Sequence, residues 1–277
     1  MPRTDHQVLR GIGIAGGESA EWVERAARAG YFAKGIVYLI IGGLAAVAAF
    51  GAGGQTTGSE GALVTILRQP FGSVLLAIIA LGLMGYVFWR VVQTTMDPEH
   101  KGSDAEGLTI RAYYLVSAVT YGALVVSAVR LIMGGGGSSG GAEQQTATLM
   151  SQPFGRWLVG LVGLLVIAAA IHQWVRAWKA KFRRRMAYEK VGPEAERWLV
   201  RLGRAGLTAR GVVFAIIGGF LLSAAVRADP EQAMGLGEAL ATLEAQAYGP
   251  WLLAAVAIGL LLYGVHQLVK ARLRRIG

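Results

Sequence analysis

Six stretches of about 20 predominantly apolar residues constrain this chain more than any other feature, because each can cross the ~30 Å hydrocarbon core of a bilayer as a helix. They cover approximately residues 31–50, 73–92, 112–133, 157–175, 208–226 and 251–269. Every backbone polar group in hydrocarbon must be bonded within its own segment or within a closed barrel. The sequence therefore predicts an all-α, polytopic membrane protein with six transmembrane helices.

The basic residues predict how the chain is oriented. Of the 27 Lys and Arg residues, all but Arg68, Arg130, Arg156 and Arg227 lie near the two termini or in alternate connections between spans. Positive charge concentrates on the cytoplasmic side of a membrane, so we expect both termini to be cytoplasmic and the net charge of +10 to reflect topology, with no nucleic acid as partner. The chain has no cysteine, which excludes disulfides and thiolate metal sites.

The chain contains an internal repeat. The segment 28–35 recurs at 204–211, and a weaker copy begins at Arg111. A four-residue motif opens the second helix of each copy: Gln-Pro-Phe-Gly at 69–72 and at 152–155, and Gln-Ala-Tyr-Gly at 246–249. The predicted division is an N-terminal tail (1–20) and three repeats of a spanning helix, a short helix and a return span, at residues 21–96, 105–186 and 194–275. Such parallel copies can close around a pseudo-threefold axis or stand in a row.

These motifs resemble a known family. Arg-Ala-Gly-Tyr opens the first span at 28–31, followed by Gly-Ala-Leu at 61–63, Pro-Phe-Gly at 70–72 and a glycine and tyrosine motif at 80–86. The pattern is similar to the bacterial membrane repeats catalogued as domain of unknown function 1206, usually three tandem copies of a two-helix unit. The middle copy departs from it, with Tyr113 and Ala118 in place of the two first-helix glycines. The resemblance implies an architecture and a bacterial inner-membrane location, without an activity.

Equivalent positions in the three copies define one candidate ring. The positions 17 residues after Gly72, Gly155 and Gly249 are Trp89, His172 and His266. Two histidines on different helices could ligate a metal or a haem iron. Trp and His are also amphipathic side chains favoured at the membrane interface, and the spans contain no carboxylate to complete a metal site. We therefore predict no metal and no cofactor.

A second set lies one turn into the first helix of each copy and consists of Lys34, Ser117 and Arg210. Charges within a span are costly and often mark an ion or substrate route. Lys34 and Arg210 could form a basic vestibule that attracts anions, or could extend to the nearby cytoplasmic interface.

Three further segments carry recognisable patterns. Residues 11–16 match GxGxxG, but no strand precedes them, so a nucleotide site is not expected. Segments 21–28 and 197–204 are amphipathic and predict helices lying on the inner membrane surface before a span. The basic run at 179–185 could contact anionic lipid headgroups.

No group of nucleophile, base and orienting residue is apparent, so no enzyme is predicted. The favoured hypothesis is a non-enzymatic membrane scaffold or partner subunit, which would bind lipid or another membrane protein. The alternatives are a small channel or transporter with a pseudo-threefold axis, and a haem- or metal-binding membrane protein.

Overall fold

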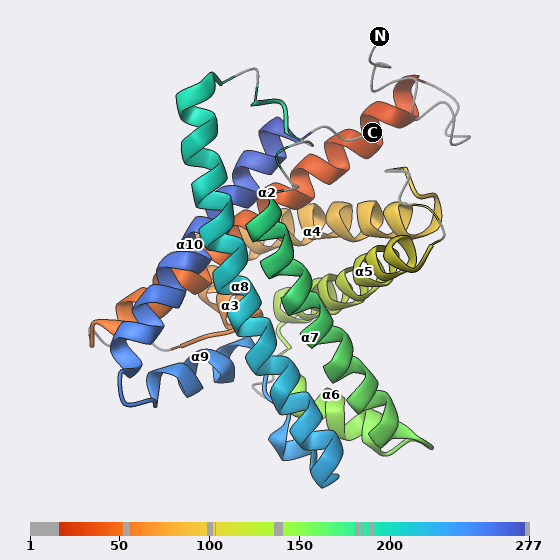
Figure 1. The fold of residues 1–277 in the computed structure, drawn as a ribbon, viewed down its shortest axis with the longest axis vertical. Coiled ribbons are helices and arrows are strands. Elements are labelled where there is room, and N and C mark those ends of the chain that lie inside the picture. The colour runs from red at the N-terminus through yellow and green to blue at the C-terminus, as the bar shows by residue number, and fades with distance from the viewer. Residues whose placement is uncertain are drawn as a thin grey trace.

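The structure is a computed structural model that describes residues 17–51, 56–98, 102, 104–135, 141–180, 183, 186–188 and 191–274. Six long helices are present in this part of the chain (Figure 1): α2 (Gly17–Ala49), α4 (Gly72–Thr95), α5 (Ala105–Ile132), α7 (Gly155–Lys179), α8 (Pro193–Arg227) and α10 (Gly249–Leu273). Between them lie α3 (Ser59–Leu67), α6 (Gly141–Met150), the 3-10 helix η3 (Pro230–Gln232) and α9 (Leu236–Glu244). The motif at 11–16, most of the tail 1–20 and part of the basic run 179–185 lie outside the described residues.

The all-α prediction with six spans is confirmed. All six long helices are long and apolar enough to cross a membrane. Large apolar side chains such as Trp157, Leu164 and Ile258 face outward, as expected where the surrounding solvent is lipid. The predicted short helix after the first span of each repeat is also present, as α3, α6 and α9.

The sequence suggested separate surface helices at the amphipathic segments 21–28 and 197–204. The structure differs from this prediction. These segments are the first turns of α2 and α8, which continue without a break into the spans. In α2 the ion pairs Arg25–Glu21 and Arg28–Glu24 are spaced four residues apart, a spacing that supports a continuous helix.

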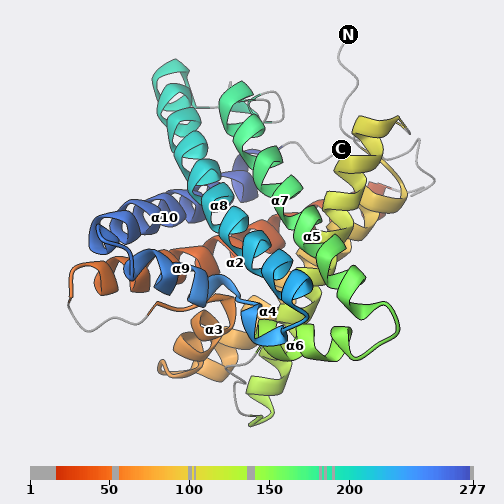
Figure 2. The same cartoon turned by 60° about the horizontal axis from the view of Figure 1, so that its bottom comes forward.

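The three repeats close into a ring. Within the first and third repeats the two spans pack together, α2 on α4 and α8 on α10. The second span of each repeat also packs on the first span of the next, as α4 on α5, α7 on α8, and α10 on α2. Figure 2 shows α8 between α7 and α10. Because α10 returns to α2, each repeat contacts both of the others, and the three copies do not form a row.

An arginine at the start of each repeat joins it to the preceding one around the ring. Arg28 donates hydrogen bonds to the carbonyls of Ala271 and Arg272 at the end of α10, both at 2.8 Å. Arg111 donates to the carbonyl of Thr94 at 2.8 Å at the end of α4, and Arg204 to that of Trp178 at 3.3 Å at the end of α7. The last carbonyls of a helix lack intrahelical partners and carry partial negative charge, which a guanidinium neutralises.

Close helix crossings distinguish the outer repeats from the middle one. A Cβ at Gly30 would lie 2.5 Å from Cα of Tyr86, and a Cβ at Gly206 would lie 2.6 Å from Cα of Tyr263. Glycine is therefore required where α2 crosses α4 and where α8 crosses α10. In the middle repeat Tyr113 occupies this glycine position, and α5 and α7 make none of the extensive contact seen between the spans of the other two repeats.

Candidate functional site: a caged cluster of cations

Three positively charged side chains from three helices are buried at the centre of the ring. Lys34 of α2, Arg90 of α4 and Arg210 of α8 are only 1%, 5% and 4% exposed. A charged side chain within a bilayer costs several kcal/mol unless it is paired or solvated, by insertion scales about 2.5–3.5 kcal/mol at the helix centre. The residues around these three side chains must therefore offset the cost of burying their charges.

Tyr86 accepts hydrogen bonds from two of the cations. Lys34 Nζ donates to its hydroxyl at 2.9 Å, and Arg90 Nε donates to the same oxygen at 2.8 Å. The Tyr86 hydroxyl also lies 3.2 Å from Oγ of Ser117, on α5. One phenolic oxygen thus connects α2, α4 and α5.

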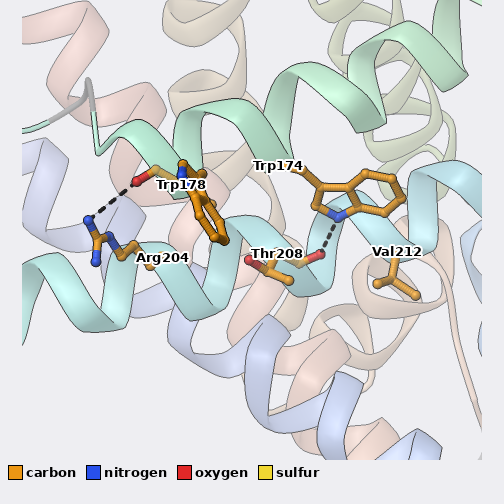
Figure 3. Close-up of a pocket in the computed structure, with 6 residues that line it drawn as sticks. Trp174, Trp178, Arg204, Thr208 and Val212 are labelled. Carbon is orange, nitrogen blue, oxygen red and sulfur yellow. Dashed lines mark hydrogen bonds between the residues drawn. The ribbon is translucent and has the colours of Figure 1, made fainter.

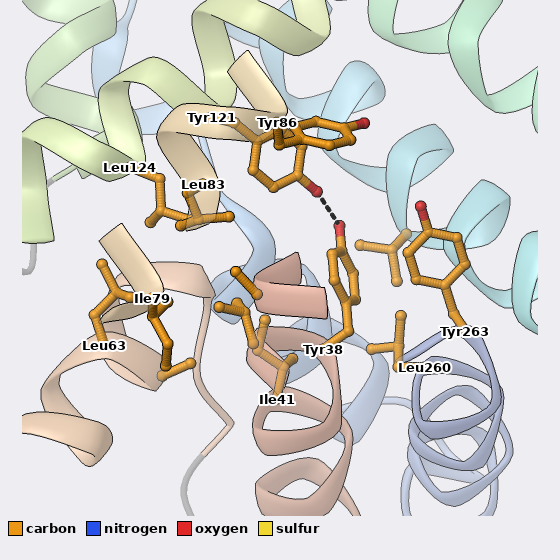
Figure 4. Packing of buried hydrophobic residues seen from close by; sticks show 14 of the residues in the cluster. Tyr38, Ile41, Leu63, Ile79, Leu83, Tyr86, Tyr121, Leu124, Leu260 and Tyr263 are labelled. Atoms are coloured by element: carbon orange, nitrogen blue, oxygen red, sulfur yellow. Dashed lines mark hydrogen bonds between the residues drawn. The ribbon is translucent and has the colours of Figure 1, made fainter. Parts of the chain in front are cut away.

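Arg210 binds a second group of tyrosines. Its Nε donates to the hydroxyl of Tyr38 at 3.0 Å, and its NH1 donates to that of Tyr113 at 3.3 Å. The hydroxyl of Tyr121 donates to Tyr38 at 3.3 Å. Four tyrosines, Tyr38, Tyr86, Tyr121 and Tyr263, meet at one end of the aliphatic core (Figure 4).

Aromatic rings also surround the charges. Lys34 Nζ lies 4.2 Å from the ring centroid of Tyr121 and 4.5 Å from that of Tyr86. The Arg210 guanidinium carbon lies 4.3 Å from the ring centroid of Phe214, and that of Arg90 lies 4.7 Å from the ring of Tyr114. A desolvated cation–π contact stabilises a charge by about 2 kcal/mol. The rings and hydroxyls offset the burial of the cations while leaving their net charge unbalanced.

No carboxylate among the described side chains is paired with these cations. The ion pairs in this part of the chain lie near the helix starts and in a connection: Arg25–Glu21, Arg28–Glu24 and Arg183–Glu196. The charges that act most strongly on Lys34 belong to Arg210, Arg90, Arg176 and Arg274, all of them positive. The centre of the ring therefore has an excess of positive charge.

Two further cations continue the cluster towards the end of α10. Lys270 and Arg274 are 5% and 6% exposed, and Arg274 NH1 donates to the hydroxyl of Tyr31. The charges acting on Lys270 include those of Arg176, Arg274 and Lys34. The positive charge thus extends from the middle of the ring towards the side that holds the end of α10.

The predicted vestibule residues are brought together. Lys34 and Ser117 meet at the Tyr86 hydroxyl. Arg210 is linked to Lys34 through hydrogen bonds by way of Tyr38 to Tyr121, whose ring centroid lies 4.2 Å from Lys34 Nζ. Lys34 and Arg210 are buried and do not extend to an interface. Sequence reasoning missed Arg90, which was assigned to a basic connection, and it missed the tyrosines. Tyr86 lies four residues before Arg90 on α4, and this helical spacing could have indicated that both side chains face the same side of the helix.

The candidate ring Trp89, His172 and His266 has a different setting. Trp89 and His266 are fully buried, and the His172 ring packs 5.5 Å from that of Tyr113. Trp89 offers no metal-ligand atom, so this set of three residues can supply at most two ligands. Within the described residues no three or more His, Asp or Glu side chains form a group that could hold a metal ion. Haem or metal binding stays an untested alternative, and the prediction of no metal and no cofactor stays a prediction.

A cavity of about 340 Å³ opens between α5 and α7. Arg210, Ser117 and Tyr121 line its inner end, and apolar side chains such as Val159 and Val166 line its wall. The cavity therefore places Arg210, a member of the cluster, beside an unfilled volume.

A second hollow lies on the outer surface between α7 and α8, lined by Trp174, Trp178 and Arg204 (Figure 3). Its polar groups are engaged in helix contacts: Trp174 Nε1 donates to the carbonyl of Thr208 at 3.2 Å, and Arg204 donates to that of Trp178. This hollow is explained by the packing of α7 on α8.

Comparison with known proteins agrees with this architecture. A family described as Domain of Unknown Function (DUF1206) matches the chain three times, over residues 29–97, 112–180 and 205–274. The chain is 39% identical to the "Uncharacterized protein YxxB" of Bacillus subtilis (strain 168) over 253 residues, which is 91% of this chain and 92% of that protein. No solved structure matches the chain. Three consecutive matches, one for each two-helix repeat of the ring, show that this chain belongs to the DUF1206 family.

Proposed function

We propose that this multi-pass membrane protein binds an anion inside the bilayer, at the cluster formed by Lys34, Arg90 and Arg210, and that it is a non-enzymatic carrier or receptor for that anion. The observation that carries the proposal is the burial of three cations at one place, bonded to tyrosines and to no carboxylate of the described chain. Ionisable groups in membrane interiors commonly mark ion and substrate sites.

Repulsion among the three cations favours an anion bound between them. Like charges in a low-dielectric interior repel strongly, and hydroxyl groups offset this without neutralising it. An anion between the cations would turn repulsion into attraction, and guanidinium groups match carboxylate and phosphate oxygens well. The cluster supplies two guanidiniums and one ammonium for this purpose.

The filled axis favours a carrier or receptor over an open channel. Tyr38, Tyr86, Tyr121 and Tyr263 are all less than 5% exposed, and they pack with aliphatic side chains in one buried core (Figure 4). An open pore would instead need a continuous polar lining. The scaffold hypothesis has no comparable structural observation in its favour.

The distribution of Lys and Arg supports a bacterial inner-membrane location with both termini in the cytoplasm. On this orientation the basic connection that follows α7 faces anionic lipid headgroups, which we propose as an additional contact.

Thermal unfolding in an uncharged detergent tests anion binding. Inorganic phosphate should stabilise the wild type relative to sodium gluconate at equal ionic strength, because a ligand of the folded state stabilises by RT ln(1 + [L]/Kd). The variants Lys34→Met and Arg210→Met should lose this stabilisation. The matched control is Arg201→Gln, which removes an exposed cation from the same helix as Arg210 and should retain it.

Stability without the anion separates a binding role from a structural one. If Arg210 is held for an anion, Arg210→Met relieves repulsion and should unfold in gluconate at or above the wild-type temperature. If Arg210 serves only its bonds to Tyr38 and Tyr113, the variant should be less stable in both salts. Equal responses of wild type and Arg210→Met to phosphate would refute the proposal.

A further inference from the structure

We infer that the anion is amphipathic, an acidic headgroup on a single alkyl chain, and that it enters from the lipid between α5 and α7. This rests on the proposed function and identifies the ligand class of the same site. The cavity between these helices joins the cation cluster to the outside of the ring.

The cavity has a polar inner end and an apolar wall. Its polar end is lined by Arg210, Ser117, Tyr113 and Tyr121, which all take part in the hydrogen-bonded network of the cation cluster. The wall is built mainly of aliphatic and aromatic side chains from α6, α7 and α8: Leu149, Val159, Val162, Val166, Phe214 and Leu221. This division of one charged end and one apolar body matches a ligand with the same division.

The lining also includes exposed side chains of both helices that border the gap. Thr120 of α5 is exposed, and Val162 of α7 is 38% exposed, whereas Ser117 and Ala169 are buried. We therefore place the mouth of the cavity, towards the surrounding lipid, at these two exposed residues. A headgroup passing between Thr120 and Val162 would meet Arg210 at the inner end.

The cavity exists because the middle repeat lacks the crossing of the other two. In the outer repeats a glycine contacts the backbone of a tyrosine whose ring enters the central cluster, as Gly30 does with Tyr86. In the middle repeat the glycine position is Tyr113, and the tyrosine position, 14 residues after Gly155, is Ala169. Tyr113 in place of glycine keeps α5 and α7 apart, and Ala169 in place of tyrosine leaves the volume of a phenol ring empty. Both exchanged residues line the cavity.

Cavity size and wall favour one alkyl chain over a bare inorganic ion. The volume, about 340 Å³, is at the lower end of the range of about 300–1,000 Å³ for small-molecule pockets. An apolar wall provides no hydrogen bonds for the remaining hydration shell of a free phosphate. An alkyl chain fills the wall without this cost, while its headgroup reaches Arg210.

Ala169→Tyr tests the inference, because it restores the tyrosine of the outer repeats and fills the cavity without removing a charge. The probes are dodecyl phosphate, dodecanol and inorganic phosphate, with thermal stabilisation in an uncharged detergent as readout. Wild type and variant are compared in the same detergent. Partitioning of the alkyl chain into the micelle therefore cancels in the ratio of their half-maximal dodecyl phosphate concentrations. Leu164→Tyr adds the same bulk to the lipid-facing side of α7, where Leu164 is 57% exposed, and is the matched control.

For wild type and Leu164→Tyr we expect stabilisation by dodecyl phosphate and none by dodecanol. Ala169→Tyr should raise the half-maximal dodecyl phosphate concentration about tenfold or more, equal to about 1.4 kcal/mol. Val166→Phe narrows the same cavity from its wall and should raise this concentration in the same direction. Inorganic phosphate should act on the wild type, Leu164→Tyr and Val166→Phe within about twofold of one another, a difference of about 0.4 kcal/mol.

The outcomes separate this inference from the proposed function. If inorganic phosphate binds but dodecyl phosphate is unaffected by both cavity variants, the alkyl-chain inference is wrong and the anion site stands. If neither phosphate stabilises the wild type, both proposals are wrong. Equal stabilisation by dodecanol and dodecyl phosphate would show a lipid-filled cavity in which Arg210 has no part, and would also overturn the inference.

Discussion

Removing the Arg28 side chain should open the ring where its first and last helices meet. Two of its hydrogen bonds, to the carbonyls of Ala271 and Arg272, are 2.8 Å long, and a third, to that of Arg274, is 3.5 Å. The side chain is 33% exposed. A hydrogen bond from a charged donor contributes about 1.5–3 kcal/mol when buried, so with partial solvent screening we expect Arg28→Ala to cost about 2–3 kcal/mol.

The equivalent arginines give an internal scale for this effect. Arg111 makes one such bond at 2.8 Å, and Arg204 makes one at 3.3 Å, so the loss on substitution by alanine should decrease from Arg28 to Arg111 to Arg204. Thermal unfolding in detergent measures it, and about 2–4 °C per kcal/mol gives a decrease of about 5–10 °C for Arg28→Ala. Arg25→Ala removes an exposed arginine paired only within α2, and should change little. A decrease for Arg25→Ala equal to that for Arg28→Ala, or the reverse order among the three arginines, would refute the reasoning.

Two further substitutions test the packing. Gly30→Ala would place a Cβ 2.5 Å from the Tyr86 backbone and should lower the free energy of unfolding by about 1–3 kcal/mol, whereas Gly43→Ala, with no atom within 4 Å, should be neutral or stabilising in the same assay. Burial, with Glu196 nearby, raises the pKa of Tyr188 to about 12, whereas an unfolded tyrosine loses its proton near pH 10. The unfolded chain therefore releases this proton first, and stability should fall between about pH 10 and 12. In Tyr188→Phe this part of the fall should be absent, and identical pH profiles would contradict it.

The spans and the repeat were predictable because they depend on features that each helix carries alone. A run of about 20 apolar residues is readable without knowing its neighbours, and the Gln-Pro-Phe motif before Gly72 recurs before Gly155. Closure of the ring was not predictable, because the contact of α10 with α2 depends on how helices from distant parts of the chain pack.

The candidate site was only partly predictable, for a different reason. Equivalence across the three copies pointed to Lys34 and Arg210. The cavity instead arises where the copies differ, at Tyr113 and Ala169. The exchange at Tyr113 was visible in the sequence, but its effect on α5 and α7 required knowing that the equivalent glycines contact a tyrosine backbone. Arg90 was missed because it lies in the last turn of the predicted span 73–92, where it was counted with the basic residues of the following connection.

The closed ring has a consequence for biosynthesis. A membrane protein is inserted from its N-terminus onward, so α2 enters the bilayer long before α10 has been translated. Until then the face of α2 that contacts α10 lacks its neighbour, and Lys34 lacks the Tyr263 ring that lies 5.8 Å from its amine in the finished protein. Ribosomes that stall before the third repeat would release a chain whose central lysine is incompletely enclosed. Such a chain would keep Tyr86 and Tyr121 against Lys34 but would lack the third repeat's contribution to this enclosure.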